Sequence, residues 1–213
     1  MLLKRARRFG VVAALVAGTT VFSAVSASAD TQAANGVKVA DKVFSSSSPK
    51  AAYDALSESD RVAFTASTTV DRIETHTVGK GLGANAGKTA NSFDGAVAAS
   101  GCWYFTFRGR AKAAAGNTLY TYWQNTAVCA RKGRITAVWT DNVDGETSTP
   151  GWRIDKDPTT KTKNVGWEGR GVARYYFVLG VGGWDIQHPT TCLQGRVNAD
   201  RVHYAVSRSC NIG

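Results

Sequence analysis

The sequence predicts a mainly β protein, an antiparallel β-sandwich or partly closed barrel with two disulfides, preceded by a short helical N-terminal region. After residue 100, short segments of alternating apolar and polar residues follow one another, separated by turn sequences. The four cysteines and all six tryptophans lie in this second part, whereas residues 30–100 are rich in Ala, Ser, Thr and Gly. We therefore expect residues 101–213 to form a disulfide-stabilised β domain and residues 30–100 a less densely packed region with short helices.

Residues 1–29 have the features of a signal peptide. Basic residues open the chain, residues 9–25 carry no charge, and Ser26–Ala29 supplies the small residues that precede a cleavage site. The uncharged run is short for a membrane span. Gly10 stands where a twin-arginine signal has a bulky apolar residue, which favours the general secretory route. We expect a secreted, extracellular chain that begins at Asp30 and is not attached to a membrane.

Local signals in the N-terminal region predict short elements. Ser48 and Pro49 form an N-cap and a first helical position, so a helix is expected from there to Leu56. A second helix, capped at Ser59–Asp60, is expected to reach Phe64. The β-branched residues of 70–78 predict a strand. The Gly- and Ala-rich stretch from 79 to 91 has little to bury and is interpreted as a flexible connection.

The first two cysteines predict a specific hairpin. If Cys102 faces Cys129 across two antiparallel strands, the turn falls on residues 114–117, which include Gly116 and Asn117. The cysteine spacing and the turn residues are independent signals, and they agree. We therefore expect a disulfide between these two cysteines.

The remaining pair is less clearly placed. A loop at residues 198–201 would leave Cys192 and Cys210 about three residues out of register in a hairpin. Four cysteines allow three pairings, and we expect the sequential one, because each bridge would then close a short loop and stabilise by about 3 kcal/mol.

Further strands follow from the alternation of residue types. The expected strands cover residues 103–108, 118–129, 135–140, 151–155, 172–181, 192–197 and 202–206, and the expected turns cover residues 132–133, 141–146 and 157–158. Trp103 and Trp139 alternate with polar residues, so both are expected on a buried strand face.

Some of these segments have a family resemblance. Gly-Cys-Trp at residues 101–103, Gly-Asn-Thr-Leu-Tyr-Thr-Tyr-Trp at 116–123, Cys129 and Arg-Ile-Thr-Ala-Val-Trp at 134–139 together resemble uncharacterised secreted β-domain proteins of actinobacteria, the high-GC Gram-positive bacteria. The resemblance covers about forty residues, and its motifs are structural. It implies an exported β domain and carries over no catalytic or binding residue.

Two segments resemble cofactor sites without meeting their requirements. Residues 81–89 come close to a phosphate-binding loop, but Leu82 stands where the motif needs a glycine. Residues 141–146 offer oxygen ligands, but in the EF-hand register the position that needs the closing carboxylate is occupied by Gly151. We expect no cofactor, no nucleotide and no EF-hand metal. An irregular calcium site at 141–146 is the alternative to a polar turn.

No arrangement of residues in the sequence defines a catalytic site. The chain has no zinc-binding His-Glu-x-x-His pattern and no Gly-x-Ser-x-Gly nucleophile motif. No catalytic residue is assigned, and an enzyme is the less favoured hypothesis. A hydrolase built on Glu168, Asp185 and His188 is the alternative, and it requires these side chains to meet in one pocket.

The tryptophans give the most informative signal of function. Trp152, Trp167 and Trp184 each follow a glycine near a strand end or loop, where ligand-binding aromatics are common, so they are the candidate ligand platform. The leading hypothesis is a non-catalytic, monomeric extracellular binding or interaction domain, with an anionic cell-wall polymer or glycan as the candidate partner. A protease inhibitor or antibacterial effector is a further alternative.

The basic residues argue against a nucleic-acid groove. The chain has a formal net charge of +10, but the basic residues of the meander divide into one group at 108–112 and another at 131–134. They do not form the single stripe that nucleic-acid backbones require.

Overall fold

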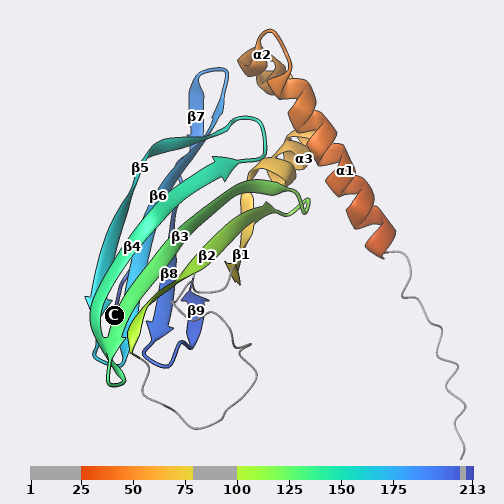
Figure 1. Ribbon diagram of the computed structural model, residues 1–213. Helices are drawn as coiled ribbons and strands as arrows, with labels where there is room; N and C mark the ends of the chain where they lie inside the picture. Colours follow the sequence, from red (N-terminus) through yellow and green to blue (C-terminus); the bar gives the residue numbers. More distant parts are fainter. Residues whose placement is uncertain (1–24, 79–99, 207–209) are drawn as a thin grey trace, which may run out of the picture.

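The structure, a computed structural model, describes residues 25–78, 100–206 and 210–213 (Figure 1). The helices are α1 (Val25–Phe44), α2 (Pro49–Asp54) and α3 (Glu58–Thr68). The strands are β1 (Val70–Val78), β2 (Gly101–Ala113), β3 (Thr118–Arg131), β4 (Arg134–Thr147), β5 (Trp152–Asn164), β6 (Glu168–Val181), β7 (Trp184–Gln187), β8 (Thr190–Asn198) and β9 (His203–Val206). The predicted flexible connection at 79–91 lies outside the described residues, as do residues 1–24 of the predicted signal peptide.

The strands form two antiparallel sheets that pack face to face. Sheet A has the order β1-β2-β3-β4, and sheet B has the order β5-β6-β8-β9, with β7 also paired to β6. The described strands do not close into a barrel, so of the two predicted architectures the sandwich is the one observed. Figure 1 shows the three helices beside the sheets at one end of the sandwich.

Both predicted disulfides are present. Cys102 faces Cys129 in the β2–β3 register, and residues 114–117 connect the two strands as expected. The second bridge joins Cys192 on β8 to Cys210. Two disulfides fit a protein that folds outside the reducing cytosol. Within the described residues, no helix is long and apolar enough to cross a membrane.

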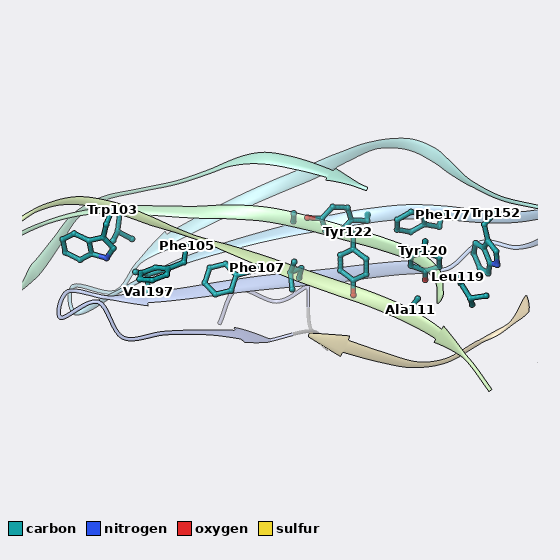
Figure 2. Packing of buried hydrophobic residues seen from close by; sticks show 14 of the residues in the cluster. Trp103, Phe105, Phe107, Ala111, Leu119, Tyr120, Tyr122, Trp152, Phe177 and Val197 are labelled. Atoms are coloured by element: carbon teal, nitrogen blue, oxygen red, sulfur yellow. The ribbon is translucent and has the colours of Figure 1, made fainter. Parts of the chain in front are cut away.

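Aromatic side chains fill the space between the sheets. Figure 2 shows the row that runs from Trp103 at one end of the core to Trp152 at the other. The rings of Tyr120 and Phe177 stack with their centroids 3.8 Å apart. These rings come from both sheets, so their burial holds the two layers together.

Glycines let the sheets approach closely at one point of the core. A Cβ on Gly171 of β6 would lie 2.3 Å from Oγ1 of Thr140 and 2.7 Å from Oγ1 of Thr126. Because such contacts are far inside van der Waals distance, only glycine fits at this position. The same is true of Gly195 on β8, where a Cβ would lie 2.3 Å from the Phe107 ring.

A second, smaller apolar cluster attaches the helices to sheet B. It consists of Val39, Ala40, Val43, Phe64 and Val181. Helix α1 was not predicted, and it begins at Val25 inside the predicted signal peptide. The α1 residues that belong to this cluster lie after Ala29, so removal of residues 1–29 would leave the cluster intact.

The helix predicted to start at Ser59–Asp60 is present, but its cap was wrong by two residues. The N-cap of α3 is Ser57, whose hydroxyl oxygen accepts a hydrogen bond from the backbone N–H of Asp60 at 3.1 Å. The predicted strand at 70–78 is confirmed as β1, and it pairs with β2 at the edge of sheet A. The domain boundary near residue 100 remains a prediction.

Two expected turns prove to be parts of strands. Residues 141–146 continue β4, and Asp157–Pro158 lies within β5. The register of β5 shifts between Lys156 and Thr159, so Pro158 occupies an irregularity in an edge strand. There its missing N–H interrupts no ladder hydrogen bond with a second neighbour, which is why the strand tolerates it.

Candidate functional site

The three tryptophans predicted as a ligand platform do not lie together. Trp152 is only 5% exposed, and its Nε1–H donates to the Thr68 carbonyl oxygen at 3.1 Å. Trp167 and Trp184 are 56% and 65% exposed, but they flank opposite ends of β6, about 40 Å apart at the usual rise per residue. One side of the Trp184 ring faces Nζ of Lys50 at 4.3 Å. No shared platform results.

The residues of the hydrolase hypothesis are also separated along β6. Glu168 opens the strand and is fully buried, where it accepts hydrogen bonds from Nε of Arg170 at 2.7 Å and from the Tyr204 hydroxyl at 2.9 Å. Asp185 lies beyond the far end of β6, 3.8 Å from Nε2 of His188. Glu168 therefore does not meet the other two in a catalytic pocket.

The acidic segment 141–146 does not gather metal ligands either. It lies in an extended strand, and the described residues contain no group of three or more His, Cys, Asp or Glu side chains that could hold a metal ion. The structure therefore gives no support to the irregular calcium site.

A bulge in β4 turns Trp139 outward, contrary to the sequence prediction. Ala130 pairs with Ile135 and Cys129 pairs with Ala137, so Thr136 is an extra residue in the ladder. One extra residue moves every following side chain to the opposite face of the sheet. Ile135 is consequently buried, whereas Trp139 is 40% exposed.

A second bulge in β4 shapes the same surface. Asn125 pairs with Asp141 and Trp123 with Asp144, which leaves one extra residue on β4. Asn142 has a positive φ of 47° within this bulge. Because of the extra residue, Asp141 and Asp144 both lie on the outer side of sheet A.

Three aromatic side chains share this outer side, and we call the surface around them the aromatic face. It comprises Tyr104, Thr106 and Arg108 of β2, Trp123 and Asn125 of β3, and Trp139 and Asp141 of β4. Ala127 pairs with Tyr104 on one side and with Trp139 on the other. The two rings therefore belong to strands about 10 Å apart, across a small residue.

A continuous chain of hydrogen bonds links the strands of the aromatic face. The Thr106 hydroxyl donates to Oδ1 of Asn125 at 2.8 Å, and Nδ2 of Asn125 donates to Oδ1 of Asp141 at 3.0 Å. The Trp139 indole N–H donates to Oδ2 of the same carboxylate at 3.0 Å. Asp141 thereby fixes the orientation of the Trp139 ring, and the polar groups are ordered before any ligand arrives.

Positive charge gathers on the β1–β2 side of this face. The Arg108 guanidinium lies 5.4 Å from the centroid of the Trp123 ring, and Arg108 pairs with His76 of β1. Burial lowers the pKa of His76, and the charges of Arg110 and Arg108 lower it further, against the opposing effect of Glu74.

The outer side of sheet B differs, because the end of the chain crosses it. The Cys192–Cys210 bridge ties residues 210–213 to β8, and Nη1 of Arg170 donates to the Ile212 carbonyl oxygen at 3.1 Å. The aromatic face of sheet A combines one exposed and two half-buried rings with ordered hydrogen-bonding groups, and we take it as the candidate binding surface.

No known protein family matches the chain, and no curated protein or solved structure is significantly similar to it. Fold and surface together define a disulfide-bonded β-sandwich with an aromatic outer sheet face.

Proposed function

We propose that the protein is a secreted, non-catalytic glycan-binding domain and that the aromatic face of sheet A is its binding surface. The observation that carries this proposal is the hydrogen-bonded chain from Thr106 to Trp139, which lies among the exposed Trp139 ring and the half-buried rings of Tyr104 and Trp123. A sugar ring has an apolar face and a polar edge, so it needs both kinds of group close together.

The aromatic rings supply the apolar contacts. Trp139 presents a ring whose orientation is fixed by its hydrogen bond to Asp141, and Tyr104 lies across Ala127 from it. Rigid aromatic side chains bind with little loss of conformational entropy. Two rings on strands about 10 Å apart can contact two sugar units of one chain.

The polar groups supply hydrogen bonds to hydroxyls. Asn125 uses one amide proton on Asp141 and retains a second, and Thr106 retains oxygen lone pairs. Both Asp141 oxygens already accept hydrogen bonds from the protein, so this carboxylate serves as a fixed acceptor. These groups can bind sugar hydroxyls, and none of them is assigned to proton transfer or nucleophilic attack.

The proposed location agrees with this ligand class. Two disulfides and the proposed signal peptide at residues 1–29 favour a chain that acts outside the cell, where wall polysaccharides are the accessible glycans. We propose that cell-wall glycan is the partner.

Replacing Trp139 by alanine tests the proposal. With oligosaccharides released from bacterial cell walls, and with chitotetraose and cellotetraose as soluble standards, calorimetry should show binding by the wild-type chain that W139A weakens at least tenfold. A loss of about 1.4 kcal/mol or more is typical of a central tryptophan.

The matched control is Trp167→Ala, which removes a more exposed indole from the loop between β5 and β6. Its affinity should equal that of the wild type. Binding that survives W139A but is lost in W167A, or no binding to any of these glycans, would refute the aromatic face as a glycan site.

A further inference from the structure

The Arg108 guanidinium lies on the aromatic face, and its Nε–H has no hydrogen-bond acceptor among the described residues. This Nε is shielded from solvent. No carboxylate among the described residues forms an ion pair with Arg108 or with Arg110. A shielded N–H without an acceptor is costly, and the remaining N–H groups of Arg108 are free to donate to an external partner.

The carboxylates on this side of sheet A are already engaged elsewhere. Glu74, which pairs with Arg110 across the sheet, accepts from Nε of Arg72 at 3.2 Å. Asp141 is held by Asn125 and Trp139, and Asp144 accepts from the Gly145 N–H at 2.7 Å. The two arginines therefore lie beside the rings without a carboxylate in ion-pair contact.

The geometry around Arg108 orients its guanidinium. The group lies over the Trp123 ring, with its carbon 5.4 Å from the ring centroid. A cation–π contact with an indole restrains the guanidinium and leaves its N–H groups able to donate hydrogen bonds. A guanidinium held this way can donate two parallel hydrogen bonds to an oxyanion.

We propose that the glycan bound by the aromatic face is acidic, and that Arg108 binds its oxyanion while Tyr104 and Trp139 contact its rings. This inference rests on the proposed glycan-binding function and specifies its ligand. Arg110 adds positive charge, and Trp123 positions the Arg108 guanidinium. A carboxylate and a phosphate share the recognised chemistry, since both offer two oxygens in one plane to the guanidinium.

Matched pairs of oligosaccharides test the proposal. One set pairs glucuronate- and galacturonate-containing oligosaccharides with their neutral methyl esters, and the other pairs phosphorylated wall oligosaccharides with their dephosphorylated forms. At low ionic strength the wild-type chain should bind the acidic member of at least one set about tenfold more tightly, and added salt should reduce this preference. Preference in the first set identifies a carboxylate, and preference in the second a phosphate.

Arg108→Gln should remove the preference for the acidic member, and an unchanged circular dichroism spectrum shows that the variant is folded. Arg108→Lys, which keeps the charge without the two-pronged geometry, should retain only part of it. Lys112→Gln is the matched control, because Lys112 is a cation on the same strand that already donates to Thr118. This variant should keep the full preference.

The outcomes separate the two proposals. Equal wild-type affinity for both members of every pair, or equal loss of preference in R108Q and K112Q, overturns the role of Arg108 and leaves glycan binding standing. Failure to bind any member of any pair overturns glycan binding itself.

Discussion

Replacing Cys102 and Cys129 together by serine should lower the free energy of unfolding by about 3.5 kcal/mol, because the bridge closes a loop with a sequence separation of 27 residues. Without the bridge, the unfolded chain gains the conformational freedom that the disulfide removes. The bond also ties β2 to β3 at the end of the hairpin farthest from its turn, so the paired strands there should fray first.

Denaturant unfolding of the oxidised wild-type and double-serine chains measures this effect. The corresponding Cys192→Ser and Cys210→Ser chain is the comparison, because its bridge ties residues 210–213 to β8 and does not cross the β2–β3 hairpin. Faster amide exchange near residues 101–103 and 128–130 is expected only in the first variant. An unchanged free energy of unfolding in that variant would show that the bridge contributes nothing to stability.

Gly171→Ala should destabilise the sandwich by about 3 kcal/mol or more, because the new methyl group has no room between the sheets. It would lie 2.3 Å from the Thr140 hydroxyl and 2.7 Å from the Thr126 hydroxyl, both of which face it from sheet A. Relief of this overlap requires the sheets to separate locally, which loosens the contacts of neighbouring core side chains.

A double-mutant cycle with Thr140→Ala gives this prediction a control. The Thr140 hydroxyl is buried and has no hydrogen-bond partner among the described residues, so its removal alone should cost little. In the double variant the closest overlap disappears, and part of the stability lost in G171A should return. Strict additivity of the two changes would contradict the proposed close approach of the sheets.

Local sequence patterns predicted the parts of the fold that depend on local chemistry. The β2–β3 register follows from Cys102, Cys129 and the turn at 114–117, and the same register places Arg108 opposite Trp123. The alternation in residues 103–108 separates Tyr104, Thr106 and Arg108 from the buried aromatic set. The β2 and β3 residues of the aromatic face could therefore be predicted from strand periodicity and one disulfide.

The β4 residues of this face could not be predicted from the sequence in the same way. An unbroken alternation from Ile135 would bury Trp139, and no residue type near Thr136 signals the bulge that reverses it. Bulges arise from the fit between two strands and between two sheets, so one strand read alone does not reveal them.

The three tryptophans that follow glycines do not lie together, and the reason is related. Trp152 packs against Tyr120 in the core, and its indole N–H donates to the carbonyl oxygen of Thr68, which lies far away in the sequence. Such a contact depends on the helices packing against the end of the sandwich, which no local pattern in residues 151–155 encodes. Similarly, the distance between Trp167 and Trp184 follows from the full length of β6.

The indole N–H signals of the six tryptophans, observed by NMR during a glycan titration, test the central proposal most directly. The proposal predicts that the signals of Trp139 and Trp123 shift and saturate together, while those of Trp167 and Trp184 stay fixed. Saturable shifts confined to Trp167 or Trp184, with Trp139 unmoved, would place the glycan elsewhere and contradict the assignment of the aromatic face.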